Sequence, residues 1–277
     1  MIVVTGATGN VGGELVRQLA ERGEAVRGVV RTATAALPDG AERAVGDLNE
    51  PESLRAAFAG ADALFLLAGY PDAVLEEARA AGITRVALLS GGSAATGRTD
   101  NAVSQYMIAT ERAVQASGLD WTFLRPSGFM SNTLQWTEQL AAGDVVRAPF
   151  ADVPIAVIDP ADIAAVALEA LTSDGHAGKA YLLTGPEPLL PADRLRILGD
   201  VLGRDLRFEA EPNDEAWTRM SASMPERYVR AFFSFYVDRT LDESIVYPTV
   251  AEVTGRPPRT FEQWATAHAA AFGGRSG

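Results

Sequence analysis

The sequence has no cysteine, and among its 24 basic residues only Lys179 is a lysine. The lack of cysteine excludes disulfides, zinc–thiolate sites and a cysteine nucleophile. The only two histidines, His176 and His268, lie far apart in the chain. A multi-histidine metal site and a Ser–His–Asp relay are therefore both disfavoured, and we expect no metal centre.

The chain also has no apolar run that approaches the ~18 residues of a membrane-spanning helix. A strand-like segment begins at residue 2, which leaves no room for a signal peptide. Positive charge is scarce, since the net charge is −12, whereas nucleic-acid binding usually needs a basic surface. We therefore expect a cytoplasmic protein, a monomer or homodimer, that binds a small molecule and neither nucleic acid nor membrane.

What the sequence does contain is an alternation of apolar, strand-like runs with helical stretches. Helical patterns cover roughly 11–19, 52–58, 72–81, 102–117 and 160–172. The last of them has Asp159 as a candidate cap and Pro160 at the first helical position. This alternation predicts right-handed βαβ units and an α/β fold with a doubly wound parallel sheet. The strand-like runs cover residues 2–5, 25–30, 42–45, 62–68, 84–90, 121–125 and 180–184.

The pattern changes near residue 185, where prolines become frequent and helical stretches dominate. This region predicts a smaller, mostly helical lobe that covers one edge of the sheet. We expect residues 1–130 and 151–185 to form a Rossmann-like dinucleotide-binding domain, and residues 131–150 and 186–277 to form a lobe on the substrate side. The helical stretches of the lobe cover 191–203, 223–237, 249–255 and 261–272.

A glycine-rich turn joins the first strand to the first helix in the sequence TGATGNVGG. In the spacing Gly6-x-x-Gly9-x-x-Gly12, Gly6 allows a tight turn and Gly9 the close approach of a pyrophosphate, while Gly12 lets the helix pack on the strand. The N–H groups at the helix N-terminus then bind the phosphates. A tight turn without a ligand has the same appearance, but the position in the first βα unit favours nucleotide binding.

The end of the second strand distinguishes NADP from NAD. An NAD site usually has an acidic residue here, which accepts hydrogen bonds from the ribose hydroxyls. This chain has Arg31 instead and no acid up to Leu37, so we expect Arg31 to bind a 2′-phosphate of NADP(H). The alternative is a solvated loop arginine. Asp47, after the third strand, can either accept from the adenine amino group or cap the following turn.

Longer segments carry a family resemblance over essentially the whole chain. They are TGATGNVG, VVRT, WTFLRPSGFMSN and IDPADIAAVA, followed by YLLTGPEPL and VTGRPPRTFEQWATAHAAAF. Together they resemble the NmrA-like branch of the atypical short-chain dehydrogenase/reductase superfamily. The resemblance implies a Rossmann-like domain, a NADP(H) site and a substrate cleft under the C-terminal lobe.

The resemblance also implies roles for individual residues. Arg31 would bind the 2′-phosphate, Asp47 would lie near the adenine, and Ser90 would lie near the nicotinamide. Phe129, in the segment RPSGFMSN, would border the substrate cleft. The residues implied to contact the phosphates and the ribose are Gly6, Thr8, Gly9, Asn10, Val11, Leu67, Ala68 and Gly69.

Ordinary members of the wider superfamily carry Tyr-x-x-x-Lys on the helix after the fifth strand. The tyrosine transfers the substrate proton and the lysine lowers its pKa. Here Tyr106 is followed by Thr110, and a second alignment puts Val103 and Met107 at these positions, so the dyad is absent. Ser90 and Tyr106 are then the candidate catalytic residues, with a packed or substrate-touching role as the alternative for the tyrosine.

An aromatic stripe marks the stretch PERYVRAFFSFYVD, where aromatic residues from 228 to 236 share one helical face. Core packing between lobe and sheet explains such a stripe. The functional alternative is a lid over a flat substrate, with Phe232 and Tyr236 opposite Phe129 and Trp136. These four are our candidate substrate-binding residues.

The absence of the dyad suits hydride transfer to a quinone. The hydroquinone anion delocalises its charge and therefore needs less help from a positioned acid than an alkoxide does. We predict an NADPH-dependent oxidoreductase that reduces a quinone, an enone or a similar conjugated carbonyl. Two alternatives stay open: a NADP(H)-binding redox sensor without turnover, and a non-redox isomerase or cyclase on the same fold.

Overall fold

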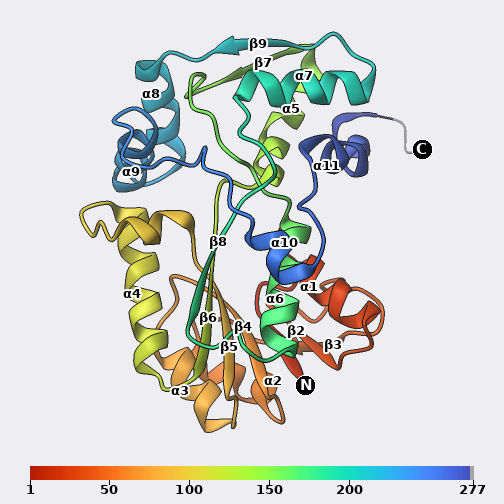
Figure 1. The fold of residues 1–277 in the computed structure, drawn as a ribbon, viewed down its shortest axis with the longest axis vertical. Helices are drawn as coiled ribbons and strands as arrows, with labels where there is room; N and C mark the ends of the chain where they lie inside the picture. The colour runs from red at the N-terminus through yellow and green to blue at the C-terminus, as the bar shows by residue number, and fades with distance from the viewer. Residues whose placement is uncertain (275–277) are drawn as a thin grey trace.

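A seven-stranded sheet forms the centre of the computed structural model, which describes residues 1–274 (Figure 1). The strand order is β3-β2-β1-β4-β5-β6-β8, and every neighbouring pair is parallel. The strands match the apolar runs of the sequence, which confirms the predicted α/β, doubly wound fold. They are β1 (Ile2–Val4), β2 (Val26–Val30), β3 (Glu42–Val45), β4 (Ala63–Leu67), β5 (Arg85–Leu89), β6 (Asp120–Pro126) and β8 (Lys179–Leu183).

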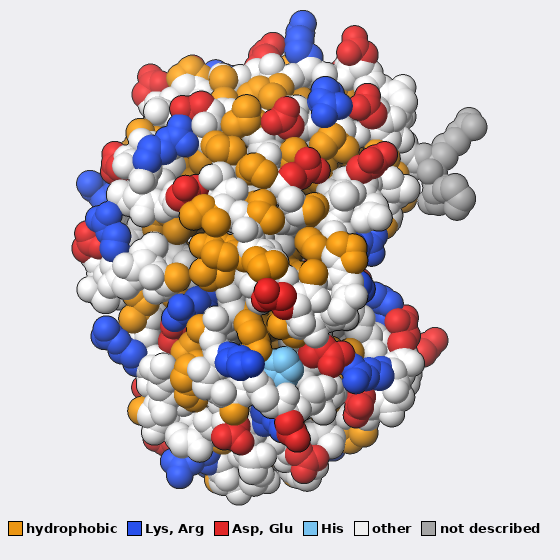
Figure 2. Space-filling view, in the orientation of Figure 1, with side chains coloured by type: hydrophobic (Ala, Val, Ile, Leu, Met, Phe, Trp, Pro, Cys, Tyr) orange, Lys and Arg blue, Asp and Glu red, His pale blue; other side chains and the backbone are white. Residues whose placement is uncertain are grey.

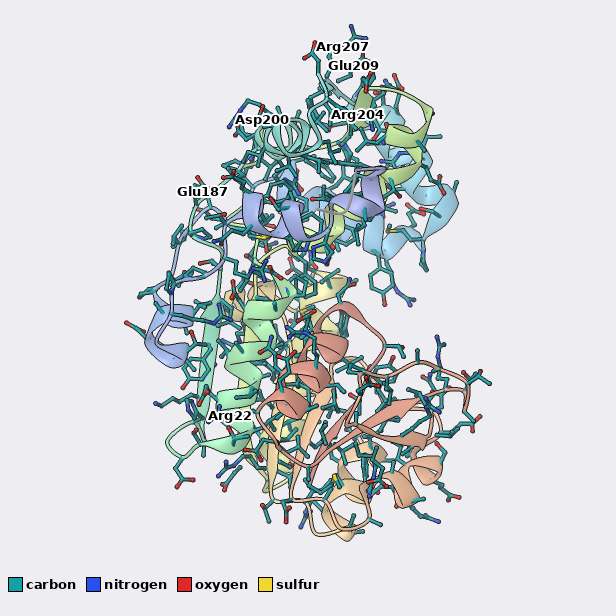
Figure 3. The ribbon with its side chains drawn as sticks, turned by 90° about the vertical axis from the view of Figure 1, so that its right-hand side faces the viewer. Arg22, Glu187, Asp200, Arg204, Arg207 and Glu209 are labelled. Carbon is teal, nitrogen blue, oxygen red and sulfur yellow. The ribbon has the colours of Figure 1, made fainter. Side chains whose placement is uncertain are left out.

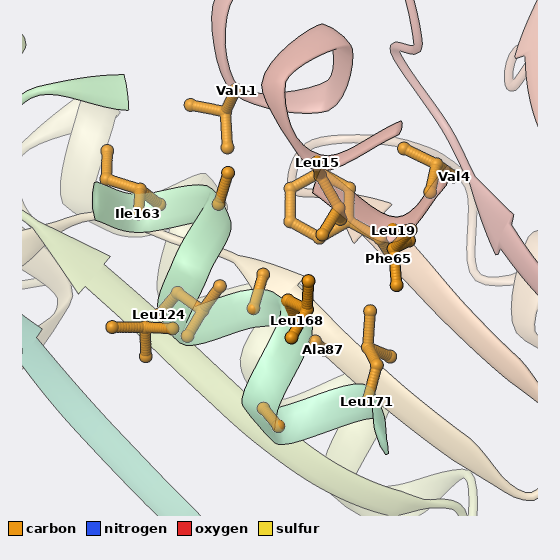
Figure 4. Close-up of a cluster of buried hydrophobic side chains, with 14 of the residues drawn as sticks. Val4, Val11, Leu15, Leu19, Phe65, Ala87, Leu124, Ile163, Leu168 and Leu171 are labelled. Carbon is orange, nitrogen blue, oxygen red and sulfur yellow. The ribbon is translucent and has the colours of Figure 1, made fainter. Parts of the chain in front are cut away.

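Helices cover both faces of this sheet, α1 and α6 on one face and α2, α3 and α4 on the other. Figure 4 shows the first core, where Leu15 and Leu19 of α1 lie close to Leu168 and Leu171 of α6. Burial of each such side chain stabilises the fold by about 1.5–3 kcal/mol, so α1 is held firmly on the sheet. The bounds are α1 (Asn10–Glu21), α2 (Arg55–Phe58), α3 (Ala73–Ala80), α4 (Ala102–Ala116) and α6 (Pro160–Thr172).

The start of α6 shows how the sequence specifies one of these helices. Asp159 Oδ1 accepts a hydrogen bond from the N–H of Ala161 at 2.8 Å, and Pro160 takes the first helical position. The helix ends at Thr172, where the sequence predicts its end. Such a cap is worth about 1 kcal/mol and fixes where the chain turns back onto the sheet.

The C-terminal lobe lies beyond the carboxyl ends of the strands (Figure 1). It is not only helical, because β7 and β9 pair in parallel from Val145 with Arg207 to Ala148 with Ala210. Neither strand is predicted from the sequence, since each has only four residues and no clear apolar alternation. Helix α8 is not predicted either. The bounds are α5 (Thr137–Ala142), β7 (Val145–Ala148), α7 (Pro191–Leu202), β9 (Arg207–Ala210), α8 (Asn213–Ser223), α9 (Glu226–Tyr236), α10 (Thr249–Thr254) and α11 (Phe261–Ala267).

Charged side chains cover the outer end of this lobe, away from the sheet. Figure 3 shows Asp200, Arg204, Arg207 and Glu209 there, on and after α7 and on β9. Inside the lobe, by contrast, Trp136, Phe261 and Trp264 are almost completely buried. The lobe thus has an apolar core of its own with a polar outer surface.

An irregular segment, residues 237–248, connects α9 to α10 across the middle of the face in Figure 1. Val237, Ile245 and Val246 are exposed in this segment. Figure 2 shows hydrophobic side chains gathered over this middle region of the molecule. Even so, none of the helices in residues 1–274 has the length and apolar character needed to cross a membrane.

Candidate functional site

The carboxyl ends of the parallel strands meet below the lobe, and they include a topological switch point. β1 lies between β2 and β4, so the chain builds the sheet first to one side of β1 and then to the other. Ligands of open α/β sheets bind in the crevice at such a point. The ends of β1 to β5 carry every residue that the sequence assigns to the cofactor.

The glycine turn leaves room for a phosphate at the N-terminus of α1. Gly6 has a left-handed backbone with φ +63°, and a Cβ on Gly12 would lie 2.2 Å from the Gly6 carbonyl oxygen. Gly9 precedes the helix, which has neither a side-chain cap nor an acidic residue in its first turn. Thr8, Gly9 and Asn10 are exposed. The first N–H groups of α1 are therefore available to an anion, which fits a pyrophosphate.

Val11 differs from these neighbours because its side chain is buried, at 4% exposure, in the core below α1. Only its backbone N–H, in the first turn of the helix, remains for a phosphate. The role implied for Val11 is therefore a backbone role.

The ends of β2 and β3 meet at the far side of the crevice. Arg31 follows β2 and is exposed, while Arg43 donates to the carbonyl oxygen of Ala33 at 2.9 Å and so supports the Arg31 loop. Asp47 Oδ1 accepts from the N–H and the amide Nδ2 of Asn49, at 2.8 and 3.0 Å. Asp47 therefore caps the turn that follows β3, which is one of the two roles predicted for it; the adenine contact stays a prediction.

The end of β4 forms the next part of the crevice. Leu67 ends the strand, and Ala68 and Gly69 follow it. Gly69 N–H donates to Thr110 Oγ1 at 3.0 Å, and a Cβ on Gly69 would lie 3.3 Å from the ring of Tyr106. Burial raises the pKa of the Tyr106 phenol above its usual value. Tyr106 thus lies beside this loop as a protonated phenol, and Thr110 binds the loop backbone.

Ser90, at the end of β5, is the first residue of a buried polar chain. Its hydroxyl donates to Glu111 Oε1 at 2.7 Å, and Arg125 donates to both Glu111 oxygens at 2.9 and 2.6 Å. The Ser90 proton is therefore engaged, and what the oxygen offers a ligand is a lone pair. Met107, one of the positions aligned with the missing dyad, packs against Gly91 next to it.

The lysine of the chain lies away from all of these groups. Lys179 is the first residue of β8 and is exposed. In a parallel sheet the amino ends of the strands lie at the edge opposite the crevice. The structure therefore agrees with the sequence that no lysine takes part at this site.

A cavity of about 600 Å³ lies under the lobe. Phe129, Trp136, Phe232 and Tyr236, the four predicted substrate residues, all line it. Phe232 and Tyr236 stack with their ring centroids 6.4 Å apart, whereas Phe235 of the same helix is in the core at 4% exposure. Phe235 therefore has the core-packing role, while Phe232 and Tyr236 line the cavity, and their role as a lid over a substrate stays a prediction. The volume suits a drug-sized small molecule.

One charged residue behind the cavity wall and one on the wall itself are not among the residues predicted from the sequence. The first is Glu243, from the irregular segment, which accepts a hydrogen bond from Tyr236 Oη at 2.8 Å. Burial raises the pKa of both groups, so Tyr236 stays a phenol at neutral pH. No local pattern marks Glu243, because only the fold brings it to α9.

The second is Arg194 of α7, which lines the cavity directly. The sequence does contain a signal for it. Arg194 shares the buried face of its helix with Pro191, Leu195 and Leu198, at the spacing i, i+3, i+4, i+7. A charged residue on an apolar helix face needs a partner, so this spacing by itself marks Arg194 as unusual.

A hydrogen bond joins the crevice to the cavity. Asn10 Nδ2, at the N-terminus of α1, donates to Ser131 Oγ at 3.1 Å. Ser131 also lines the cavity. A dinucleotide on the glycine turn and a small molecule under the lobe would therefore be neighbours.

Comparison with known proteins supports this picture. A family model described as NAD(P)H-binding matches residues 6–174, from the glycine turn through α6. A (4-alkanoyl-5-oxo-2,5-dihydrofuran-3-yl)methyl phosphate reductase from Streptomyces griseus is 40% identical over 280 residues, which covers 98% of this chain and 99% of that protein. An NAD(P)H azoreductase from Xenophilus azovorans is 36% identical over 285 residues, with 99% of each chain covered.

Solved structures with the same fold include two of interest. An NADPH-dependent quinone oxidoreductase from Escherichia coli, complexed with NADPH, has a TM-score of 0.76 at 22% identity and covers 96% of this chain and 99% of its own. The negative transcriptional regulator Nmra has a TM-score of 0.69 at 19% identity, over 96% and 94% of the two chains. These likenesses concern the fold alone, and the fold of this chain is thus shared with Nmra. The family match confirms the predicted NAD(P)H-binding, Rossmann-like character of the chain.

Proposed function

The chain belongs to the NAD(P)H-binding family, and from this premise we propose that it is an NADPH-dependent reductase of quinones, enones or similar conjugated carbonyls. In this proposal residues 1–130 and 151–185 hold the dinucleotide, and residues 131–150 and 186–277 shape the substrate side. The observation that carries it is the hydrogen bond from Asn10 to Ser131, which joins the glycine turn to an aromatic-lined cavity.

Two relatives support the type of acceptor. The Streptomyces griseus protein is a reductase of a 5-oxo-2,5-dihydrofuran, a ring in which the double bond is conjugated with a carbonyl. The Xenophilus azovorans protein is an azoreductase, and an azo group is likewise a conjugated acceptor. Both match this chain over nearly its whole length.

The residues of the chain suit such an acceptor. When bound, the nicotinamide supplies a hydride, and a conjugated acceptor spreads the resulting negative charge toward its heteroatom. Phe129 and Phe232 offer flat apolar walls for a ring, and Ser90 presents an oxygen lone pair at the end of β5. Tyr236 remains protonated because burial and Glu243 raise its pKa. The site thus orients a ring without the tyrosine–lysine acid that a simple ketone requires.

The direct test is NADPH oxidation measured against a panel of quinones, enones and azo dyes. Steady turnover with at least one class is expected, with simple ketones inactive. Tight NADP(H) binding without turnover of any acceptor would instead favour a redox sensor. Conversion of a substrate without net oxidation of NADPH would favour an isomerase or cyclase.

The preference for NADPH is proposed to depend on Arg31. The Arg31→Ala variant should bind NADPH about 10- to 100-fold more weakly, the scale of a charge-assisted contact to the 2′-phosphate, and NADH almost unchanged. Calorimetry with both cofactors measures this. Equal losses for both would mean that Arg31 supports the loop and does not recognise the phosphate.

Tyr106 is expected to contribute little to the chemistry. Tyr106→Phe keeps the ring beside Gly69 and removes only the hydroxyl, so kcat for a quinone should fall less than about tenfold, below the ~10²–10⁴-fold of a lost general acid. Phe129→Ala, which removes a cavity wall, should act mainly through KM. Steady-state kinetics with saturating NADPH separate the two. A thousandfold drop in kcat for Tyr106→Phe would assign it the role of the acid.

A further inference from the structure

We propose that Arg194 is the anchor for an anionic group on the substrate, so that the cavity takes acceptors carrying a carboxylate, sulfonate or phosphate. The inference rests on the proposed function in one respect, because the conjugated carbonyl of this substrate is the acceptor named there. The anion site itself rests on separate observations, which concern the arginine and the charge of the cavity.

Arg194 is a buried cation without a partner. It is 8% exposed, and within residues 1–274 its guanidinium forms neither a hydrogen bond nor an ion pair, with Nε buried and unsatisfied. The ring of Trp136 lies beside it, with the ring centroid 5.4 Å from Cζ. A buried charge that no hydrogen bond or ion pair in residues 1–274 balances costs stability, and the contact with Trp136 offsets only part of that cost.

The rest of the cavity strengthens the positive charge of this site. Among the described residues 1–274, none that lines the cavity is an aspartate or a glutamate. Its other cation, Arg219, is paired with Glu211 at 2.7 and 2.9 Å, which leaves Arg194 as the uncompensated charge. Burial lowers the pKa of Arg194 to about 10, so the guanidinium still carries its charge at neutral pH.

The chemistry of the guanidinium defines what it would bind. Its planar fork of N–H donors matches two oxygens of a carboxylate, sulfonate or phosphate. The contact with Trp136 restricts the orientation of the fork, and Asn132 and Gln135 add amide groups to the same lining. A flat acceptor between Phe129 and Phe232 would then have its anionic substituent at one end of the cavity.

A binding experiment tests the anchor without any turnover. We use calorimetry in saturating NADP⁺ with 2-naphthoate and its neutral analogue, 2-naphthamide. The unaltered protein should bind the carboxylate about 10- to 100-fold more tightly, the scale of a charge-assisted pair. Arg194→Met should abolish this preference. Arg196→Met, on the same helix with a side chain 66% exposed and paired to Asp200, is the matched control and should keep it.

Several results would overturn the proposal. The first is equal binding of 2-naphthoate and 2-naphthamide by the unaltered protein, and the second is an unchanged preference for 2-naphthoate in Arg194→Met. The third is a loss of NADPH affinity in Arg194→Met, which would mean that the arginine binds the cofactor.

Arg194→Lys, which keeps the charge, should retain part of the preference for 2-naphthoate. Because no acceptor in residues 1–274 forms a hydrogen bond or an ion pair with the guanidinium, and methionine can keep the apolar contact with Trp136, Arg194→Met should also keep the Tm of the unaltered protein or exceed it. A fall of several degrees would mark a structural role.

Kinetics distinguish this proposal from the proposed function. With 1,4-naphthoquinone-2-sulfonate and 1,4-naphthoquinone as acceptors, Arg194→Met should lower the ratio of their kcat/KM values about 10- to 100-fold, mainly through KM for the sulfonate. An equal loss of kcat with both quinones would mean that Arg194 stabilises the negative charge that forms during the reaction and does not bind an anionic substituent. If no quinone is reduced, the proposed function fails, while the naphthoate preference still decides the role of Arg194.

Discussion

Gly9→Val is expected to abolish NADPH binding, with a loss of affinity above about 100-fold, while the protein stays folded. The backbone of Gly9 is extended, at φ −88° and ψ 174°, a conformation that valine adopts readily. The nearest atom to a new Cβ is the Gly6 carbonyl oxygen at 3.2 Å, which requires only a small adjustment. The branched side chain would instead occupy the space in front of the first N–H groups of α1, where the pyrophosphate is proposed to lie.

Gly13→Ala provides the matched control for this experiment. Gly13 lies in α1, and its new Cβ would make an ordinary contact, 3.4 Å from the Ala7 carbonyl oxygen. Alanine also favours a helix over glycine by roughly 1 kcal/mol, so this variant should bind NADPH normally with an equal or higher Tm. Calorimetry and thermal unfolding of both variants measure the difference. Unchanged NADPH affinity in folded Gly9→Val would exclude the glycine turn as the phosphate site.

The sheet and its cofactor crevice were predictable because their signals are local. A parallel strand buried on both faces is a nearly continuous apolar run, as in the ALFLL of β4, and such runs stand out from the sequence. The cap at Asp159 with Pro160 is likewise a short-range pattern. The glycine spacing at β1 then fixes where the crevice lies, since the carboxyl ends of parallel strands share one edge.

The cavity was predictable only in part, because its composition depends on contacts between distant segments. Phe232 and Tyr236 could be predicted from their helical spacing. The hydrogen bond between Tyr236 and Glu243 could not, because it depends on how residues 237–248 return to the sheet. For Asp47 the sequence allowed either an adenine contact or a turn cap. Only the structure shows that its carboxylate accepts a hydrogen bond from the N–H of Asn49. The short strand β9 lacked a pattern because its side chains are mostly exposed.

Contacts of Asp162 in α6 with the segment before α11 hold the lobe to the sheet. We expect Asp162→Ala to weaken this attachment strongly. Asp162 is completely buried, with Oδ1 accepting from Arg256 Nη1 and Oδ2 from the N–H of Arg259, each at 2.7 Å. Arg259 also pairs with Asp159 at 3.1 Å. These contacts connect the start of α6 to the segment before α11, which packs with Trp136 in the core of the lobe.

Removal of the Asp162 carboxylate leaves the Arg259 N–H without its acceptor and removes the ion-pair partner of Arg256, whose side chain is 44% exposed and remains hydrated. We expect a loss of about 2–3 kcal/mol of unfolding free energy, which in a chain of this size is a fall of roughly 4–10 °C in Tm. Asp174→Ala is the matched control, because the Asp174 side chain is fully exposed beside Arg85, and its Tm should not change. Thermal unfolding of the two variants measures this difference in Tm.

Equal Tm values would show that apolar packing alone holds the lobe. A loss confined to Asp162→Ala, with a raised KM and intact NADPH affinity, would show that the buried carboxylate keeps the cavity wall in place over the sheet.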